Sequence, residues 1–318
     1  MQRLVDTYTI PLDINARSLD YSRGKITIHW SDNHRSIFPE NYLINNSYDP
    51  KLNDETNSNK KMLWNSKDIR KIHPKVEFKQ VMSDDKILLQ WLENIEKYGI
   101  CFVKNVPHNA KDSEALARRI SFIRETHYGK YWDFTANLEH GDTAYTTIGL
   151  GAHTDTTYFT EPIGLQMFHL LEFQGIGGKS LFVDGFRIAE ELKRLQPEAF
   201  EILTKIKLSH QYVGDENAKF ISHGNPIIRL DEHDKLYQIR FNNNDRTFLS
   251  KQNAKNIEDF YFALNEWNKP GTVVIFDNWR VLHGRNEYVG HRRLSGCYIN
   301  RDDYISRLTT LREKYSKK

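Results

Sequence analysis

Gly164-Leu-Gln-Met-Phe-His-Leu-Leu171 is a short apolar and aromatic run of the kind that forms a strand. Similar runs recur through the second half of the chain, at 144–147, 180–183, 227–230, 236–241, 272–276 and 294–299. Between them, apolar residues at helical spacing predict helices over 188–195 and 197–206. Many short strands with few helices predict a mainly β fold with flanking helices, an antiparallel sandwich or barrel rather than a parallel sheet.

The first half of the chain is organised differently. Residues 25–30 alternate between polar and apolar, which predicts a half-buried strand in a small β-rich N-terminal unit. A polar stretch over 49–61 has the composition of a linker. We therefore expect a small N-terminal domain over 1–75 and a larger domain over 76–318.

Further elements of the larger domain can be predicted from the residues at which they begin and end. A helix is expected between an N-cap at Ser83 and a stop at Gly99, followed by a strand over 100–106 and a helix over 112–124. The stretch 209–225 is expected to be a loop over one mouth of the fold.

Composition excludes several classes of protein. The 318 residues carry 45 basic and 42 acidic side chains, a net charge of +3, which is too balanced for a nucleic-acid or membrane-surface protein. No apolar run approaches the roughly 20 residues of a membrane span. With only Cys101 and Cys297, no disulfide framework or cysteine-rich zinc cluster is expected. The start lacks an apolar signal core and contains Asp6 and Asp13, so we expect a cytoplasmic protein. We expect its partner to be a small-molecule substrate, with no nucleic acid and no membrane.

The strongest chemical signal is Gly151-Ala-His153-Thr-Asp155-Thr-Thr-Tyr-Phe159. Residues two apart in an extended segment point to the same face, so His153 and Asp155 can address one point. Iron(II) in oxygenases is held by two imidazoles and one carboxylate. His283, in Asp277-Asn-Trp-Arg-Val-Leu-His283-Gly-Arg285, is the candidate third ligand. The alternative for the short motif alone is a structural histidine beside a turn aspartate.

A cationic side chain follows in His291-Arg292-Arg293-Leu294. A dicarboxylate cosubstrate that chelates iron through a 2-oxo acid needs a donor for its far carboxylate, and arginine offers two parallel donors. In a strand Arg292 and Arg293 point to opposite faces, so only one can enter the fold and the other is a surface charge. The hydroxyl of Ser180 is a weaker candidate to share that carboxylate.

Several aromatic residues lie close in sequence to the segments that contain His153 and Arg292. Rings that surround a quaternary ammonium group attract it, by about 0.5–2 kcal/mol each. The alternative is that these residues fill the core. The candidates are Tyr128, Trp132, Tyr145 and Tyr298.

Taken together, these segments resemble the γ-butyrobetaine/trimethyllysine dioxygenase family of Fe(II)/2-oxoglutarate oxygenases, over about residues 30–312. The matching segments are His153-Thr-Asp-Thr-Thr-Tyr-Phe159, Val183-Asp-Gly-Phe186, Phe276-Asp-Asn-Trp-Arg-Val-Leu-His-Gly-Arg285 and Gly296-Cys-Tyr-Ile-Asn-Arg-Asp-Asp303. The resemblance implies a double-stranded β-helix (jelly-roll) catalytic domain behind a small N-terminal domain.

The resemblance also implies roles for individual residues. It places iron on His153, Asp155 and His283, and 2-oxoglutarate on Arg292 rather than Arg293. It places a trimethylammonium cage on Tyr128, Trp132, Tyr145 and Tyr298.

The sequence departs from the family at two places. Family members usually carry zinc-binding cysteines in the N-terminal domain, whereas the matching stretch 38–46 has none, so we expect no structural zinc. The butyrobetaine branch has an asparagine where this chain has Asp142. An anion there suits an α-ammonium group, which trimethyllysine has and butyrobetaine lacks. The alternative is that Asp142 is a turn residue.

The resemblance therefore implies hydroxylation of trimethyllysine at carbon 3 by a homodimer that uses Fe(II), 2-oxoglutarate and ascorbate. The alternatives are a γ-butyrobetaine dioxygenase, an oxygenase of another small acid such as a sulfonate, and a non-catalytic sensor that binds metal or oxoglutarate.

Overall fold

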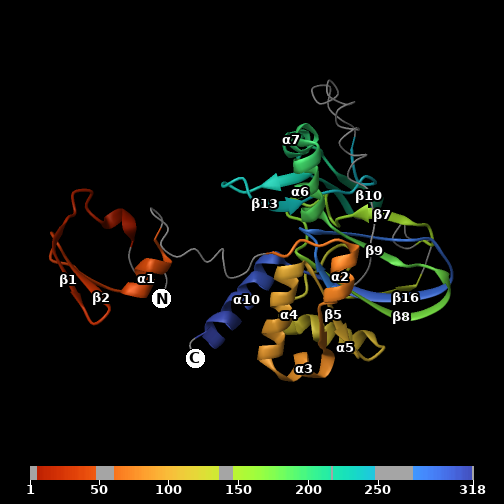
Figure 1. Cartoon of the computed structure of the whole chain (residues 1–318), viewed down its shortest axis with the longest axis horizontal. Helices are drawn as coiled ribbons and strands as arrows, with labels where there is room; N and C mark the ends of the chain where they lie inside the picture. Colours follow the sequence, from red (N-terminus) through yellow and green to blue (C-terminus); the bar gives the residue numbers. More distant parts are fainter. Residues whose placement is uncertain (1–5, 48–60, 136–145, 216–217, 248–274, 317–318) are drawn as a thin grey trace. The chain divides into compact units, whose positions relative to one another are not determined.

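The computed structural model covers 318 residues and describes all of them except 1–5, 48–60, 136–145, 216–217, 248–274 and 317–318. The chain divides into two compact units, Met1–Lys60 and Lys61–Lys318 (Figure 1).

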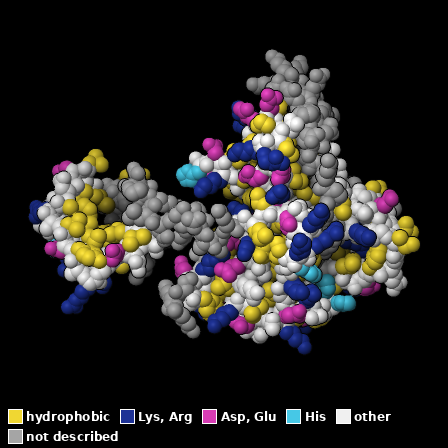
Figure 2. Space-filling model, viewed as in Figure 1, with side chains coloured by type: hydrophobic (Ala, Val, Ile, Leu, Met, Phe, Trp, Pro, Cys, Tyr) yellow, Lys and Arg dark blue, Asp and Glu magenta, His cyan; other side chains and the backbone are white. Residues whose placement is uncertain are grey.

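The smaller unit is a three-stranded antiparallel sheet in the order β1-β2-β3, and β2 coincides with the strand predicted over 25–30. None of its described residues is buried. Leu19 and Tyr21 are 61% and 60% exposed, and Figure 2 shows hydrophobic side chains on its visible face. The described part of this unit therefore has no hydrophobic core of its own. Its elements are η1 (Thr7–Thr9), β1 (Ala16–Ser22), β2 (Lys25–Trp30), β3 (Arg35–Pro39) and α1 (Glu40–Asn45).

The larger unit contains two main sheets and two hairpins. A six-stranded sheet has the order β4-β5-β14-β8-β16-β6, and a three-stranded sheet has the order β7-β15-β9. The long strands β8 and β16 pair antiparallel along their length, and β4 with β5 is the parallel pair among the described strands. The strands are β4 (Lys75–Glu77), β5 (Ile100–Lys104), β6 (Trp132–Thr135), β7 (Leu150–His153), β8 (Leu165–Gly177), β9 (Ser180–Asp184), β10 (Gln211–Asp215), β11 (Ala218–Ile221), β12 (Ile228–Leu230), β13 (Leu236–Ile239), β14 (Ile275–Asp277), β15 (Val281–Arg285) and β16 (Tyr288–Ile299).

Helices cover these sheets. In α4, the Asp84 side chain rather than the expected Ser83 caps the first turn by accepting from the Lys86 amide, and Gly99, at a φ of +73°, ends the helix. No described helix has the length and hydropathy of a membrane span. The helices are α2 (Ser66–Ile72), α3 (Phe78–Ser83), α4 (Asp85–Tyr98), α5 (Ala110–Ile120), α6 (Gly185–Leu195), α7 (Pro197–Lys205) and α10 (Arg301–Ser316).

Four hydrophobic clusters lie among the described residues of the larger unit, and three of them join its helices and sheets. The first joins α3, α4, α5 and α10 to the six-stranded sheet, and the second packs α6 and α7 against β12, β13 and β15. The third contains Phe182 of β9, Val281 of β15, Phe276 of β14 and Ile100 of β5. Because these side chains come from both main sheets, the two sheets pack against each other, and the space between them holds the site described below.

A buried ion pair fixes the start of the larger unit. Arg280 and Asp184 are fully buried, with Arg280 Nε 3.0 Å from Asp184 Oδ1. Arg280 also donates to the carbonyls of Lys97 and Met62, and Asp184 accepts from the amide of Trp64 at 3.0 Å. Residues 61–75, which the sequence grouped with the N-terminal domain, therefore belong to the larger unit.

The observed fold is mixed α/β, with more strand than helix among the described residues. The predicted helix over 112–124 lies at Ala110–Ile120, and the helices over 188–195 and 197–206 are present as α6 and α7. The expectation of a loop over 209–225 was wrong, because β10 and β11 form a hairpin there. Residues 146 and 147 of the run predicted at 144–147 are not in a strand, and the rest of that run lies outside the described residues.

Candidate metal centre and active site

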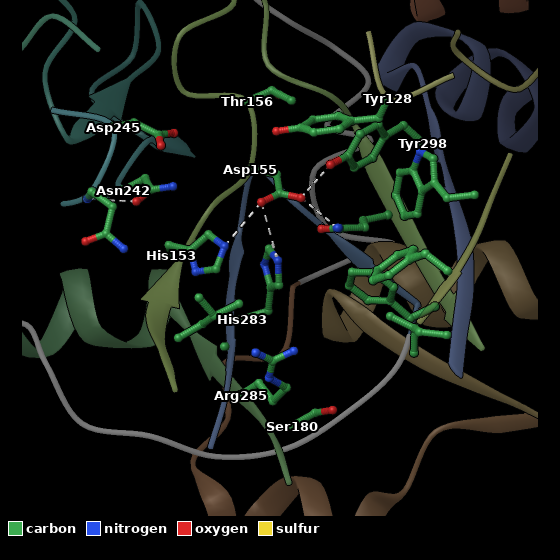
Figure 3. A pocket seen from close by; sticks show the side chains of 18 of the residues that line it. Tyr128, His153, Asp155, Thr156, Ser180, Asn242, Asp245, His283, Arg285 and Tyr298 are labelled. Carbon is green, nitrogen blue, oxygen red and sulfur yellow. Dashed lines mark hydrogen bonds and ion pairs between the residues drawn. The ribbon is translucent and has the colours of Figure 1, made fainter. Parts of the chain in front are cut away.

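Three side chains converge between the two main sheets. His153 ends β7 and His283 lies in β15, and the two residues face each other in the antiparallel pairing of these strands. Asp155 follows two residues after β7. The Nε2 atoms of His153 and His283 lie 3.2 Å and 3.6 Å from Asp155 Oδ1 (Figure 3). The potential ligand atoms of all three side chains lie within 4.8 Å of one another, as around a single metal ion.

Neighbouring backbone groups orient these side chains. His153 Nδ1 is 2.8 Å from the carbonyl of Gly151 and donates to it, so in the neutral ring the lone pair is on Nε2, which faces Asp155 Oδ1. The side chain of Asn278 accepts from the Asp155 amide at 2.8 Å and donates to the Asp155 carbonyl at 3.1 Å. This reciprocal pair fixes the backbone from which the Asp155 carboxylate projects.

The turn after Asp155 is also held in place. Thr156 has a φ of +54°, which is rare for a β-branched residue, and its hydroxyl accepts from the Ile163 amide at 3.0 Å. The hydroxyl of Thr157 donates to Asp245 Oδ2 at 2.8 Å. A strained backbone that its surroundings hold in place is common at functional sites.

The protonation states of Asp155 and His283 suit a metal site. At His153 burial favours the neutral ring, but the hydrogen bond to Asp155 and the charge of that carboxylate together outweigh burial and raise the pKa. Burial alone would raise the pKa of the Asp155 carboxyl, but His283, His153 and the Tyr298 hydroxyl outweigh burial and hold that pKa well below its usual range. Burial and the neighbouring His153 lower the pKa of His283 to about 3. At neutral pH the site therefore offers a carboxylate and a neutral imidazole at His283, the forms that bind metal. Two imidazoles and one carboxylate are the donor set of iron(II) oxygenases, so the residues fit that ion.

A cavity of about 640 Å³ opens beside the triad. Its wall includes eight of the residues singled out from the sequence: Tyr128, Trp132, His153, Asp155, Ser180, His283, Arg292 and Tyr298. Asp142 and Tyr145 lie outside the described residues.

The two adjacent arginines differ in their surroundings. Arg293 reaches Asp133 at 2.7 Å and Glu172 at 2.8 Å on an exposed face of the sheet. Arg292 lines the cavity, where burial and then Arg285 lower its pKa to about 10. No described carboxylate pairs with Arg292, which lies 5.7 Å from the centre of the Tyr288 ring. Of the two side chains, Arg292 is the one placed to meet an anion in the cavity.

Rings form one wall of the cavity. Trp132 and Tyr298 meet edge to face, with centroids 4.5 Å apart, and the hydroxyls of Tyr128 and Tyr158 are 3.1 Å apart. Tyr212 of the β10–β11 hairpin packs on Tyr158, with centroids 5.2 Å apart. Tyr158 and Tyr212 were not selected from the sequence. Tyr158 lies inside the His153 motif and could have been found there, whereas Tyr212 lies in the stretch expected to be a loop.

Other polar cavity residues were also missed. Arg285 lies two residues after His283 and therefore on the same face of β15, a signal that the sequence contained. It donates to the carbonyls of Thr146 and Ile148, each at 2.7 Å. Nothing in the local sequence indicated that Gln166 or three residues after β13 would line the cavity. Those three residues are Asn242, Asn244 and Asp245.

Comparison with known proteins shows the family of the chain. The model of the family described as "Taurine catabolism dioxygenase TauD, TfdA family" matches residues 67–298. The chain belongs to the TauD/TfdA dioxygenase family. Within this family it is 40% identical to "Trimethyllysine dioxygenase, mitochondrial" of Mus musculus, over 96% of this chain and 76% of the relative. It is 30% identical to "Gamma-butyrobetaine dioxygenase" of Pongo abelii, over 96% and 84%. The resemblance drawn from the sequence is thus confirmed.

A solved structure shares the fold at low sequence identity. The non-heme iron oxygenase OrfP, in complex with Fe, succinate and (3S)-hydroxy-L-Arg, is 12% identical, with a TM-score of 0.52. The match covers 71% of this chain and 85% of that one.

Proposed function

We propose that this protein is an Fe(II)- and 2-oxoglutarate-dependent dioxygenase that hydroxylates N6,N6,N6-trimethyllysine at carbon 3, giving 3-hydroxy-trimethyllysine, succinate and CO2, in carnitine biosynthesis. The observation that carries this proposal is the convergence of His153, Asp155 and His283 in a cavity whose lining also contains aromatic rings and the half-buried Arg292. The relatedness to trimethyllysine dioxygenases supports the choice of substrate.

The architecture fits this proposal. We propose that the two main sheets form a double-stranded β-helix, with the triad between them. We also propose that the catalytic domain begins at residue 61 rather than 76, and that residues 1–60 form a separate N-terminal domain. The packing of Phe182 and Val281 from one sheet against Phe276 and Ile100 from the other supports the sandwich.

His153, Asp155 and His283 would hold the iron. Bound there and chelated by 2-oxoglutarate, Fe(II) supplies the oxidising chemistry: one atom of O2 enters the substrate, the other enters succinate, and CO2 leaves. The protein contributes geometry and the exclusion of water. Asp155, already anionic, and the neutral His283 can bind without losing a proton.

Arg292 would hold the far carboxylate of 2-oxoglutarate. Its charge persists at neutral pH, and a charge-assisted hydrogen bond is strong in a site with little water. Ser180 faces Arg285 in the β9–β15 pairing, and Figure 3 shows both on the same side of His283. We propose that the Ser180 hydroxyl shares this carboxylate and that Arg285 adds positive potential nearby.

The opposite parts of the cavity suit the two ends of trimethyllysine. Tyr128 and Tyr298 lie on one side of the triad, whereas Asn242 and Asp245 lie on the other (Figure 3). We propose that the trimethylammonium group lies against Tyr128, Trp132, Tyr298 and Tyr145. Asp245, besides Asp155 the one carboxylate in the described cavity wall, would attract the α-ammonium group, with Asp142 as a second candidate. Carbon 3 is bonded to the carbon that bears this ammonium group, so holding that end of the substrate would select it.

The decisive experiment offers trimethyllysine and butyrobetaine separately to the protein with Fe(II), 2-oxoglutarate and ascorbate. Succinate release and product mass are measured. We expect one succinate per hydroxylated trimethyllysine and slower use of butyrobetaine. Faster use of butyrobetaine would make the protein a γ-butyrobetaine dioxygenase, and turnover of a sulfonate alone would indicate another oxygenase. Binding of Fe(II) and 2-oxoglutarate without any turnover would indicate a sensor.

Three further expectations remain predictions. Ascorbate is expected to sustain turnover by keeping the iron reduced, which its omission tests. A homodimer is expected, which light scattering tests. A cytoplasmic location is expected, although the mouse relative is named mitochondrial; fractionation of the source cells tests it.

A further inference from the structure

The two oxygens of the Asp155 carboxylate have different surroundings. Oδ1 faces the Nε2 atoms of both histidines. Oδ2 accepts two hydrogen bonds from the opposite sheet, from the Tyr298 hydroxyl at 2.7 Å (Figure 3) and from Gln166 Nε2 at 2.6 Å. The carboxylate is thus held with one oxygen toward the common point and the other turned away.

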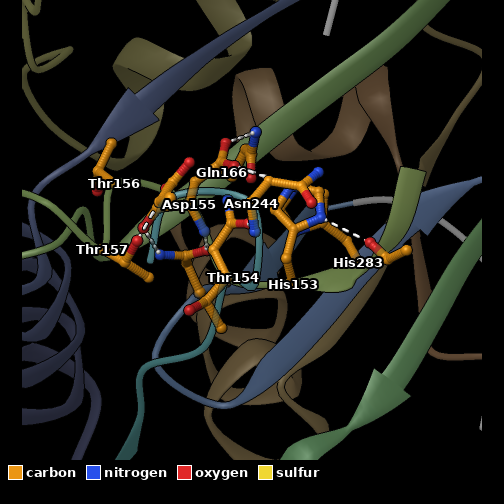
Figure 4. A network of polar contacts seen from close by, with 12 residues as sticks. His153, Thr154, Asp155, Thr156, Thr157, Gln166, Asn244 and His283 are labelled. Carbon is orange, nitrogen blue, oxygen red and sulfur yellow. Dashed lines mark hydrogen bonds and ion pairs between the residues drawn. The ribbon is translucent and has the colours of Figure 1, made fainter. Parts of the chain in front are cut away.

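The pairing of β8 with β16 explains why both donors reach the same atom. Gln166 and Tyr298 are direct partners in this antiparallel pair, so their side chains project from the same face. That face looks toward the loop that carries Asp155, and Figure 4 shows Gln166 beside Asp155. Tyr298 also belongs to the ring wall of the cavity, whereas the described contacts give Gln166 no part in that wall's ring packing.

Packing alone does not explain a glutamine at position 166. The residue is 2% exposed, and its Oε1 is buried without a hydrogen-bond partner among the described residues. A buried acceptor without a donor destabilises the folded state, and an apolar residue of similar shape would avoid that cost. The Nε2 hydrogen bond to Asp155 is the contact that distinguishes glutamine from such a residue.

We propose that Gln166 is a positioning residue for the metal ligand Asp155. By donating to Oδ2, its amide stops the carboxylate from rotating to present both oxygens to the metal. One coordination position that a bidentate carboxylate would occupy then stays available for the chelating cosubstrate or O2. Groups that hydrogen-bond to metal ligands in this way typically change metal affinity 10- to 100-fold when they are removed. This inference rests on the metal site of the proposed function but not on the identity of the substrate.

The test uses the full chain with Gln166→Met, which removes both the donor and the unpartnered acceptor. Gln174→Met is the matched control, because Gln174 is exposed on the same strand β8. Mn(II) is titrated into each metal-free protein, free Mn(II) is followed by electron paramagnetic resonance, and the melting temperature is measured without metal. We expect the Kd for Mn(II) to rise about 10- to 100-fold in Q166M. The metal-free melting temperature should stay the same or rise, and Q174M should match the wild type in both.

Each of the other possible results contradicts either the role of Gln166 or the metal site itself. If Q166M binds Mn(II) as the wild type does, or melts lower with unchanged affinity, Gln166 is a core residue and the inference is wrong. Gln166→Leu is made alongside, so that a packing defect particular to methionine is recognised; if both variants fold worse than the wild type, the inference is also wrong. If the wild type itself binds no Mn(II), the proposed metal site fails instead.

Discussion

Arg292 provides the clearest quantitative prediction, because Arg293 beside it is a natural control. The perturbation is Arg292→Gln, which keeps a polar side chain and removes the charge. Arg292 lines the cavity, no described carboxylate neutralises it, and its pKa of about 10 leaves it protonated. If it holds the distal carboxylate of 2-oxoglutarate, the substitution removes a hydrogen bond between charged groups.

The magnitude follows from that contact. A hydrogen bond to a charged group contributes about 1.5–3 kcal/mol, and each 1.4 kcal/mol is a factor of ten. The KM for 2-oxoglutarate should therefore rise about 10- to 100-fold, with the KM for trimethyllysine little changed. Because Arg292 lies near Arg285 without a described counter-ion, the melting temperature of the metal-free protein should not fall.

The assay is succinate release as a function of 2-oxoglutarate at saturating trimethyllysine. Arg293→Gln is measured in parallel. Its guanidinium bonds Asp133 and Glu172 at the surface, so the KM for 2-oxoglutarate should match that of the wild type. Equal effects of the two substitutions, or a normal KM in R292Q, would refute the assignment.

Three other predictions address the substrate and the stability of the fold. Trp132→Leu keeps an apolar side chain but removes a ring face that contributes about 0.5–2 kcal/mol, so the KM for trimethyllysine should rise roughly 2- to 30-fold; an unchanged KM in steady-state kinetics would place the cation elsewhere. Asp245→Asn should raise the KM for trimethyllysine and leave the KM for butyrobetaine unaltered, since only trimethyllysine has an α-ammonium group. If both KM values change in parallel, or if only Asp142→Asn raises the KM for trimethyllysine, the α-ammonium group has a partner other than Asp245. Burial, followed by the charges of Arg240 and Arg246, lowers the pKa of His210 from 6.5 to about 3 in the folded protein. As the pH falls below 6.5, His210 therefore gains a proton in the unfolded chain before it does in the folded one, and the free energy of unfolding decreases. The loss from pH 7 to 5 is about 2 kcal/mol, and His210→Gln should flatten this slope in urea unfolding; an equally steep slope would show that other groups cause it.

The sequence predicted the site better than the topology. Strand periodicity was sufficient to put His153 and Asp155 on one face, because that relation is local. The same periodicity separated Arg292 from Arg293 but could not say which one faces inward, since that depends on the pairing of β16 with β8 and β6. The opposition of His153 and His283 is likewise a property of strand pairing.

Other features could not be predicted from local sequence patterns. Gln166 stands in an apolar run, and only the β8–β16 register reveals its contact with Asp155. The β10–β11 hairpin has short strands whose pattern is too brief to distinguish from a loop. By contrast, Tyr304, Leu308 and Leu311 are spaced as one face of a helix, so the sequence does contain a signal for α10.

The central claim is that His153, Asp155 and His283 bind one Fe(II) that the reaction requires. It is tested most directly by anaerobic equilibrium dialysis of the wild type and Asp155→Ala against Fe(II), with succinate release measured on the same samples. We predict one Fe(II) per wild-type chain, and loss of both bound iron and succinate release in D155A. A D155A protein that keeps one Fe(II) and full turnover of trimethyllysine would contradict the claim.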